Sequence, residues 1–396
     1  MRIVLAHNFY QQAGGEDKVF YAEKSLLEEK EHIVSTLTKH NDEILRYSLP
    51  QKFLFPFKTV YHSTYKRYLR RFIEQARPDI VHFHNTFPLI SPAAYDACYE
   101  ANVPVVQTLH NFRLLCPSAL FLRSGKVCED CLGKTPPWPA LRHACYRNSR
   151  TQTAVLTAML TSHRILRTWQ NKVNTYIVLN SFARQKFIDG GLPPDKIVVK
   201  PNFVAEPGII PKSAEYALFV GRLSEEKGIK VLINAWENVK DIPLKIIGNG
   251  PLFDLAKRLI ETYKIRNAEL LGKLSSAHVW EYLSRATFLV MPSICYENLP
   301  MTIIEAFAAG VPVIASRLGG MAEIVTDRHT GLHFTPGDAV DLAKKIRWAW
   351  ENSPQMSEMS KAARKEYENK YTAEKNYQML LKIYQNAIKN QKKTAR

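Results

Sequence analysis

Short apolar runs alternate with helical segments along the whole chain, and the alternation restarts once near the middle. The runs Arg2–Asn8, Ile80–Asn85 and Pro104–Asn111 precede that point, whereas Tyr216–Arg222 and Leu244–Gly248 follow it. Runs of this length and composition are typical of strands that are buried on both faces. Strands of this kind, separated by helices, form parallel sheets covered by helices. We therefore predict an α/β fold with two doubly wound domains that face a central cleft.

The length of the chain, 396 residues, is sufficient for two domains with separate hydrophobic cores. The segment 205–213 contains two prolines and a glycine, a composition typical of a linker. We therefore place the first domain at residues 1–205 and the second at residues 206–370.

The formal net charge of +17 favours anionic partners, which include nucleic acids, anionic membrane surfaces and anionic substrates. We find no nucleic-acid-binding motif, so we expect no specific nucleic-acid partner. No run of 18 apolar residues occurs, and the strand-like start is too short for a signal peptide. We therefore expect a cytoplasmic protein without a transmembrane helix.

The segment Cys295–Gly310 predicts a ligand site at the edge of the second sheet. Apolar runs at 287–291 and 311–315 flank it, and Pro300 has the position of a first helical residue. The loop and helix start therefore lie at the carboxyl end of a strand, where open α/β sheets bind ligands. Glu297 could accept hydrogen bonds from a sugar, and Glu305 from a ribose. The backbone N–H groups that could bind phosphate belong to Leu299, Met301 and Thr302.

Two cations follow the first strand of the second half. Arg222 ends that strand, and Lys227 stands at the start of the next helix, where its charge opposes the helix dipole. This unfavourable placement indicates an anion nearby, and the pair would suit a diphosphate. Surface cations on a loop are the alternative interpretation. Glycines in the strand-to-helix loops would allow close approach of a ligand, or only form tight turns: Gly14, Gly15, Gly248 and Gly250.

His110 ends a predicted buried strand of the first half, at the edge where ligands bind. A histidine in this position could act at the site or could be a hydrogen-bonded core residue. His82 and His84 share one face of another strand, but two histidines alone do not define a metal site.

Four cysteines lie in a segment of about 116–145 that is rich in glycine, proline and polar residues. They are Cys116, Cys128, Cys131 and Cys145. A C-x2-C pair with two flanking cysteines matches tetrahedral thiolate ligation of a structural zinc ion. Disulfides are not expected in a cytosolic protein. Unmetallated thiols and a redox pair are the alternatives to zinc.

The segment Lys58–Gln75 has apolar and aromatic residues interleaved with arginines and lysines, and it follows the apolar cluster Phe53–Phe57. Such a stretch can lie on a membrane interface, or it can be a core-facing helix with a solvated basic face. We therefore include a peripheral contact with the inner face of a membrane among the expected partners.

The stretch Cys295–Gly310, with its Tyr-Glu-Asn-Leu-Pro context, resembles the nucleotide-binding signature of retaining family 4 glycosyltransferases, which have the GT-B fold of two Rossmann-like domains. The resemblance covers nearly the whole chain, although the four-cysteine segment is absent from most members. It implies a first, acceptor-side domain, a second domain that binds the nucleotide sugar, and a C-terminal helix, residues 371–396, that crosses back to the first domain.

The resemblance implies a retaining transfer of a hexosyl group from a nucleoside-diphosphate sugar to a glycan or lipid-linked acceptor, in bacterial-type polysaccharide or glycoconjugate synthesis. The residues implied in catalysis are His110, Arg222, Lys227 and Glu297. The residues implied in donor binding are Gly14, Gly15, Gly248, Gly250, Asn298, Leu299, Met301, Thr302 and Glu305. No Asp-x-Asp triplet occurs, so protein cations should replace a catalytic metal on the diphosphate.

Two other functions are compatible with parts of this pattern. A nucleotide-sugar epimerase or hydrolase on the same fold would act on the donor without an acceptor. A basic, zinc-stapled binding protein would bind nucleic acid in a salt-sensitive way that survives the loss of Glu297 and Arg222.

Overall fold

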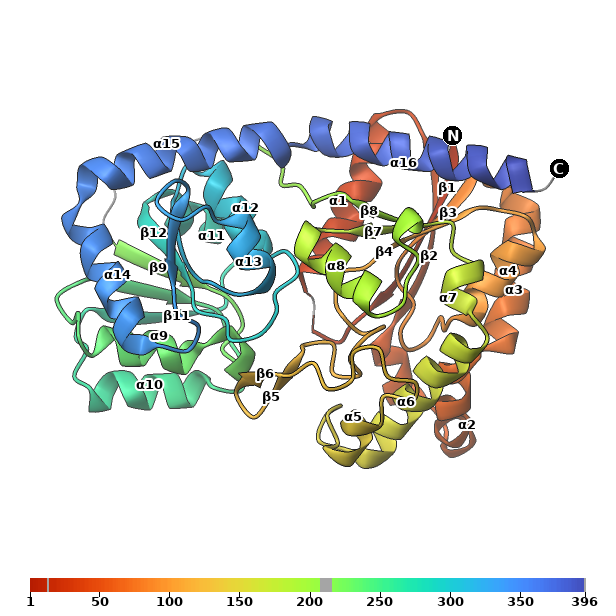
Figure 1. The fold of residues 1–396 in the computed structure, drawn as a ribbon, viewed down its shortest axis with the longest axis horizontal. Coiled ribbons are helices and arrows are strands. Elements are labelled where there is room, and N and C mark those ends of the chain that lie inside the picture. The colour runs from red at the N-terminus through yellow and green to blue at the C-terminus, as the bar shows by residue number, and fades with distance from the viewer. Residues whose placement is uncertain (13, 207–215, 395–396) are drawn as a thin grey trace. The chain divides into compact units, whose positions relative to one another are not determined.

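The computed structural model describes residues 1–12, 14–206 and 216–394, and most of the predicted linker, 207–213, lies outside these ranges. The chain divides into two compact units. The first comprises Met1–Ala119, Glu129–Lys200 and Asn376–Arg396, and the second comprises Leu120–Cys128 and Pro201–Lys375. Each unit contains one six-stranded parallel sheet flanked by helices (Figure 1). The predicted α/β class with two doubly wound sheets is therefore confirmed.

The sheet of the first unit has the strand order β2-β1-β3-β4-β7-β8. Its strands are β1 (Arg2–Phe9), β2 (Ile33–His40), β3 (Ile80–Asn85), β4 (Val105–Thr108), β7 (Thr175–Val178) and β8 (Ile197–Val199). Its helices are α1 (Gly15–Glu29), η1 (Asn41–Arg46), α2 (Leu49–Val60), α3 (Ser63–Ala76), α4 (Ala93–Glu100), α5 (Trp138–Arg142), α6 (Arg150–Ile165), α7 (Thr168–Asn171), α8 (Ser181–Asp189), η2 (Pro194–Lys196) and most of α16 (Ala373–Thr394). The strand order reverses between β1 and β3, which defines the topological switch point of this sheet.

The sheet of the second unit has the order β11-β10-β9-β12-β13-β14, with its switch point between β9 and β12. Its strands are β9 (Tyr216–Val220), β10 (Leu244–Ile247), β11 (Ala268–Gly272), β12 (Ala286–Met291), β13 (Val313–Ser316) and β14 (Gly331–Phe334). Its helices are η3 (Glu225–Lys227), α9 (Ile229–Trp236), α10 (Phe253–Thr262), α11 (Ser276–Ser284), α12 (Met301–Ala308), α13 (Gly319–Ile324), α14 (Ala339–Glu351) and α15 (Ser353–Lys370). A hairpin, β5 (Leu122–Arg123) and β6 (Lys126–Val127), also groups with this unit.

The C-terminal helix α16 packs against the sheet of the first unit. Its residues Leu380 and Tyr384 are fully buried in one apolar cluster with Ile3 and Leu5 of β1. The burial of apolar surface on this face explains why a segment at the end of the chain is part of a core formed by its beginning.

The amphipathic segment 58–75 is divided between two helices. In α3 the apolar side chains of Tyr65, Leu69 and Ile73 are buried, so this helix faces the core and exposes its basic face. Tyr68 of α3 is 54% exposed, but the larger exposed fractions belong to the preceding helix α2, where Phe53 and Phe57 are 75% and 66% exposed.

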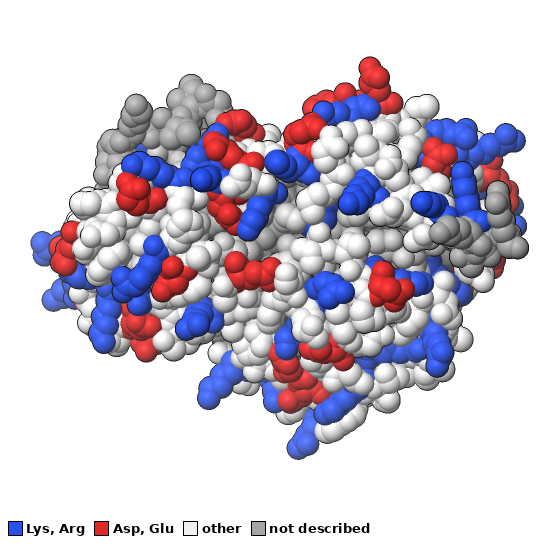
Figure 2. Space-filling view, turned by 45° about the horizontal axis from the view of Figure 1, so that its top comes forward, with Lys and Arg blue, Asp and Glu red and all other residues white. Residues whose placement is uncertain are grey.

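The positive charge is distributed rather than concentrated. On the face that Figure 2 shows, the Lys and Arg side chains of the described residues are interspersed with Asp and Glu side chains. None of the described helices is both long enough and apolar enough to cross a membrane.

Candidate functional site

The loops after β9 and β12 meet at the switch point of the second sheet, and they carry the predicted catalytic residues of this unit. Lys227 ends the short helix η3, which follows β9, and Glu297 lies in the loop between β12 and α12. Lys227 Nζ donates a hydrogen bond of 2.6 Å to Glu297 Oε1, which also accepts one of 2.8 Å from Ser293 Oγ. The structure therefore brings together two residues that are 70 positions apart.

The Lys227–Glu297 pair keeps the lysine charged. Burial acts to lower the pKa of Lys227, but the charge of Glu297 and the hydrogen bond to it outweigh this effect and raise the pKa. Gly228 follows with a φ of +70°, and a Cβ there would lie 1.8 Å from the carbonyl oxygen of Pro292. Only glycine can therefore allow the lysine loop to approach the strand end so closely.

Arg222 lies two residues beyond β9, and its side chain is exposed. It forms no ion pair or side-chain hydrogen bond with another described residue. Arg222 is therefore a cation on the same loop as Lys227, without a partner among the described residues, and it is available to bind an anion.

The predicted donor-binding stretch forms the start of α12. Pro300 is the N-cap with an extended backbone, and Met301 is the first helical residue, one position later than predicted. Asn298, Leu299 and Glu305 are buried, whereas Met301 and Thr302 are partly exposed. The first-turn N–H groups of a helix have no intrahelical partner, so this end carries partial positive charge at the switch point.

The glycines after β10 have a structural explanation. A Cβ at Gly248 would lie 1.8 Å from the carbonyl oxygen of Gly221, and one at Gly250 would lie 2.4 Å from that of Leu223. The loop after β10 is also hydrogen-bonded to the loop after β9, since Leu223 N–H donates to Asn249 O. These glycines are therefore required where the loop after β10 packs on the loop after β9.

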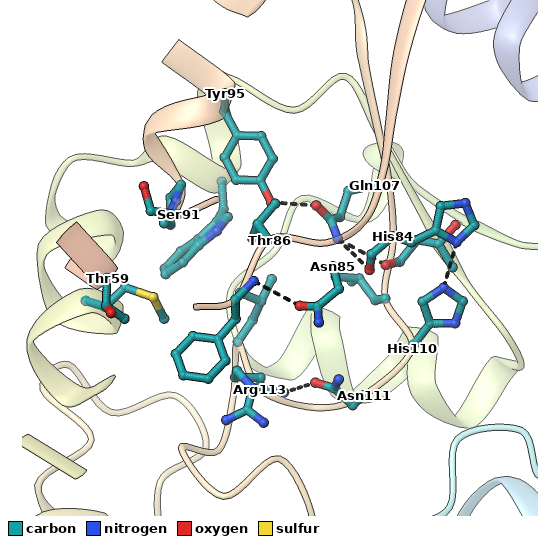
Figure 3. A pocket seen from close by; sticks show the side chains of 17 residues that line it. Thr59, His84, Asn85, Thr86, Ser91, Tyr95, Gln107, His110, Asn111 and Arg113 are labelled. Carbon is teal, nitrogen blue, oxygen red and sulfur yellow. Dashed lines mark hydrogen bonds between the residues drawn. The ribbon is translucent and has the colours of Figure 1, made fainter. Parts of the chain in front are cut away.

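In the first unit, His110 follows β4 and contacts a second histidine. His110 Nε2 lies 3.0 Å from His84 Nδ1, and the two rings stack (Figure 3). Burial and the neighbouring His84 lower the pKa of His110 well below its ordinary value, so its ring is neutral at neutral pH. His84 Nε2 in turn lies 3.4 Å from Glu23 Oε2 of α1.

Glu23, His82 and His84 form a buried cluster that the sequence did not reveal, because Glu23 is remote in the chain. Their nitrogen and oxygen atoms lie within 4.8 Å of one another, a spacing compatible with metal ligation. However, Lys200 Nζ donates to Glu23 Oε1 at 2.6 Å, and both side chains are fully buried. The ammonium group of Lys200 therefore already neutralises this carboxylate.

The loop after β1 contains Gly14, the N-cap of α1, with Gly15 as the first helical residue. Gly14 N–H donates to Asp17 Oδ2 at 2.9 Å, so this amide is already bonded within the helix start. A Cβ at Gly14 would meet nothing within 4 Å, so the glycine is not required by crowding.

The predicted four-cysteine zinc site is not supported by the described residues. Among the described residues, which include all six cysteines, the only group with clustered ligand atoms is Glu23, His82 and His84, and no disulfide is formed. The segment is held by its own turns: Cys128 N–H donates to Phe121 O and Cys145 N–H donates to Ala140 O.

A cavity in the first unit is lined by His84, His110, Asn111 and Arg113 (Figure 3). The sequence analysis missed Arg113, although its position three residues after His110 at a strand end was an available signal. Its guanidinium lies 4.5 Å from the centre of the Phe87 ring and 5.4 Å from that of Tyr146.

The comparisons with known proteins agree with this architecture. Residues 13–206 match the family described as Glycosyltransferase Family 4, and residues 203–366 match the family described as Glycosyl transferases group 1. The solved structure of HepE from Anabaena in complex with UDP has the same fold, with a TM-score of 0.68 and 17% identity over 97% of this chain and 99% of that chain. The fold class is therefore GT-B. Within that class, residues 203–366 are similar to the group 1 glycosyltransferases and residues 13–206 to Glycosyltransferase Family 4.

Two relatives match parts of the chain. An uncharacterized glycosyltransferase of Methanocaldococcus jannaschii is 32% identical over 170 residues, which are 43% of this chain and 48% of that protein. A putative teichuronic acid biosynthesis glycosyltransferase of Bacillus subtilis is 27% identical over 270 residues, 68% of this chain and 60% of that protein. The chain thus spans between about half and three fifths of the length of these relatives.

Proposed function

We propose that this protein transfers a hexosyl group from a nucleoside-diphosphate sugar to a glycan or lipid-linked acceptor. In this proposal the second unit, with the predicted domain 206–370, binds the donor, and the first unit binds the acceptor. The observation that carries the proposal is the 2.6 Å contact between Lys227 and Glu297 at the switch point of the second sheet. Arg222, which has no partner among the described residues, lies on the same loop as Lys227. HepE, which has the same fold, binds UDP, so UDP is the first nucleotide to test.

The charges of this site suit the departure of a diphosphate. Negative charge develops on the leaving group, and Arg222, Lys227 and the N-terminal amides of α12 would stabilise that charge as it forms. We assign Glu297 to holding the donor sugar and orienting Lys227. Because two protein cations are present, we propose that no divalent metal is needed. Retention of configuration rests on the resemblance of residues 295–310 to retaining family 4 enzymes.

Nucleotide binding tests the donor site directly. We expect calorimetry in the presence of EDTA to show micromolar binding of UDP or GDP to the wild-type protein. Arg222→Ala should weaken this binding roughly 10- to 100-fold, since a hydrogen bond to a charged group contributes about 1.5–3 kcal/mol. Arg258→Ala, which removes an exposed arginine of α10 in the same unit, should bind like the wild type. A folded wild-type protein that binds neither nucleotide would contradict the proposal.

The products of the reaction distinguish transfer from the alternative activities. An epimerase or hydrolase would convert the donor sugar at full rate without an acceptor. A transferase should release the nucleoside diphosphate quickly only when an acceptor is added.

We also propose that the acceptor is reached at a membrane surface, through helix α2. The support is the exposure of Leu49, Phe53 and Phe57, which are 83%, 75% and 66% exposed, on a helix that also carries the exposed cation Lys52. The rings of Phe53 and Phe57 lie 6.4 Å apart, so they form one apolar surface. Aromatic residues beside cations suit the interface of an anionic bilayer.

Co-sedimentation with vesicles tests this contact. The wild-type protein should bind vesicles that contain phosphatidylglycerol more strongly than vesicles of phosphatidylcholine alone. The double variant Phe53→Ser/Phe57→Ser should bind at least about tenfold more weakly, because each buried aromatic side chain contributes about 1.5–3 kcal/mol. Val340→Ser, which changes an exposed apolar residue of the second unit, is the control. Equal binding of the double variant and the wild type would refute the assignment of α2.

A further inference from the structure

Three buried polar atoms in the first unit have no hydrogen-bond partner in the described structure, and they come from one small region. They are Tyr10 Oη, Glu16 Oε1 and Arg113 Nε. Tyr10 follows β1 and Glu16 lies in the first turn of α1, whereas Arg113 follows β4. A buried polar atom without a partner is costly, so three of them together indicate a site for a polar ligand.

The region has the position that the topology predicts for a ligand. The switch point of this sheet lies between β1 and β3, and Tyr10 is the first residue beyond the carboxyl end of β1. Asn111 connects the two sides, because its Nδ2 lies 3.5 Å from Glu16 Oε2 and its Oδ1 accepts from Arg113 N–H at 3.0 Å. Figure 3 shows Asn111 and Arg113 together at one end of the cavity.

Arg113 is held in place by contacts that leave part of its guanidinium unused. Its Nη1 donates to the carbonyl oxygen of Pro117 at 3.0 Å, and its plane lies against Phe87 and Tyr146. The backbone carbonyl and the two rings carry no net charge. The Nε atom of Arg113 has no hydrogen-bond partner among the described residues, and the contacts orient the cation without neutralising it.

The carboxyl group nearest to this cation does not neutralise it at neutral pH. Burial, reinforced by repulsion from Asp17 and opposed by Arg113 and Asn111, raises the pKa of Glu16 to about 8. Burial also raises the pKa of Tyr10 to about 12. Both groups are therefore protonated at pH 7, and each can donate a hydrogen bond. A fixed cation surrounded by O–H donors is suited to an anion.

We propose that Tyr10, Glu16 and Arg113 form a subsite for an anionic group, a phosphate or a carboxylate, on the acceptor. This inference rests on the proposed function only where it identifies the ligand as the acceptor, since the binding of an anion can be measured without sugar transfer. Transfer would then favour acceptors that carry such a group, because Arg113 and the two O–H donors would position the acceptor relative to His110.

Calorimetry with sulfate, which remains a dianion between pH 6 and pH 10, tests the subsite. Sulfate should bind the wild-type protein at pH 7, and Arg113→Met should weaken this binding at least tenfold. Arg150→Met, which removes an exposed arginine at the start of α6, should bind sulfate like the wild type. Equal binding by Arg113→Met and the wild type would overturn the proposal. Loss of nucleotide binding in Arg113→Met would also overturn it, by assigning the residue to the donor site.

Two further variants keep the test valid if Arg113→Met does not fold. Tyr10→Phe removes only the unpartnered hydroxyl group, so it should fold normally and bind sulfate several-fold more weakly. Glu16→Gln keeps a hydrogen-bond donor but cannot ionise.

The groups that face Glu16 are Asp17 of α1, Tyr10 beyond β1, and Asn111 and Arg113 beyond β4.

The pH dependence gives the most specific result. Wild-type binding of sulfate should weaken as the pH rises through about 8, because Glu16 loses its proton and becomes an anion beside the ligand. Glu16→Gln should retain its affinity to pH 9.5. A flat wild-type profile, or normal affinity in Tyr10→Phe, would overturn the assignment of these residues as donors. A comparison of methyl phosphate with glucuronate at pH 7 then identifies which anionic group binds more tightly, and binding of neither would overturn the proposal.

Discussion

Replacing Lys227 by methionine is expected to lower kcat/KM for sugar transfer by about 10²- to 10³-fold. Removal of one preorganised donor to a developing negative charge costs about 2.7–4 kcal/mol of transition-state stabilisation. Lys227 would supply more than a dipole, because the charge of Glu297 and the hydrogen bond to it outweigh the effect of burial and keep a full positive charge at the switch point of the second sheet. Methionine retains the approximate length of the side chain and removes the charge.

The control for Lys227→Met is a variant that removes a lysine outside the predicted site. Lys257→Met changes an exposed residue of α10 in the same unit, and its kcat/KM should equal that of the wild type. Steady-state rates should be measured with the nucleotide sugar that binds in calorimetry, together with the thermal midpoint of each variant. A Lys227→Met enzyme that is folded and has the wild-type kcat/KM would show that the lysine does not act on the leaving group.

Replacing Lys200 by methionine is expected to lower the free energy of unfolding by about 3–5 kcal/mol, the cost of leaving one member of a buried ion pair uncompensated. Lys200 and Glu23 are both fully buried, and Lys200 also donates to Asn376 Oδ1 of α16 at 3.1 Å. The variant therefore removes the partner of a buried carboxylate and one contact to the C-terminal helix. Urea unfolding, with the midpoint and slope both measured, gives the difference.

Two further variants separate the ion pair from the loss of packing. In the double variant Lys200→Met/Glu23→Gln no unpaired charge remains, so much of the lost stability should return. Lys24→Met breaks a Lys–Glu contact of 3.0 Å on the partly exposed surface of the same α1 helix, and its effect should be below about 1 kcal/mol. An equal effect of Lys24→Met and Lys200→Met would contradict the role of burial.

The buried ion pair of Lys200 and Glu23 also predicts how the stability of the protein should depend on pH. Burial alone would raise the pKa of Glu23, but Lys200, with smaller contributions from His84 and His82, holds it well below its ordinary value. A depressed folded-state pKa stabilises the protein above the unfolded-state pKa, which is about 4.3 for glutamate. The contribution of Glu23 should therefore be complete at neutral pH and should be lost as the pH falls below about 4.

Much of the architecture could be predicted from local patterns. The strands near 216–222, 244–248 and 287–291 are present as β9, β10 and β12 within one or two residues. Buried strands in alternating α/β folds are nearly continuous apolar runs, so their positions are visible without knowledge of their neighbours. The start of α12 was similarly predictable from the proline before it.

The cysteine segment shows where local reasoning fails. The C-x2-C spacing is compatible with zinc, but ligation requires four sulfur atoms at one point, and no cluster of cysteines is found among the described residues. The amphipathic segment 58–75 gave a mixed result for the same reason. Its pattern predicted helix, but only the packing determined that Tyr65 and Leu69 of α3 face the core while the most exposed aromatic residues belong to α2.

By itself, the sequence determined the fold class, the positions of most strands, and the loops on which the predicted donor-site residues lie, because these depend on apolar periodicity and turn residues within a few positions. Only the tertiary structure decided which side chains meet: Lys227 with Glu297, Lys200 with Glu23, and Arg113 with Tyr10 and Glu16. These pairs join residues up to 177 positions apart. Their charges depend on burial and on strand order, which arise only when the sheets assemble.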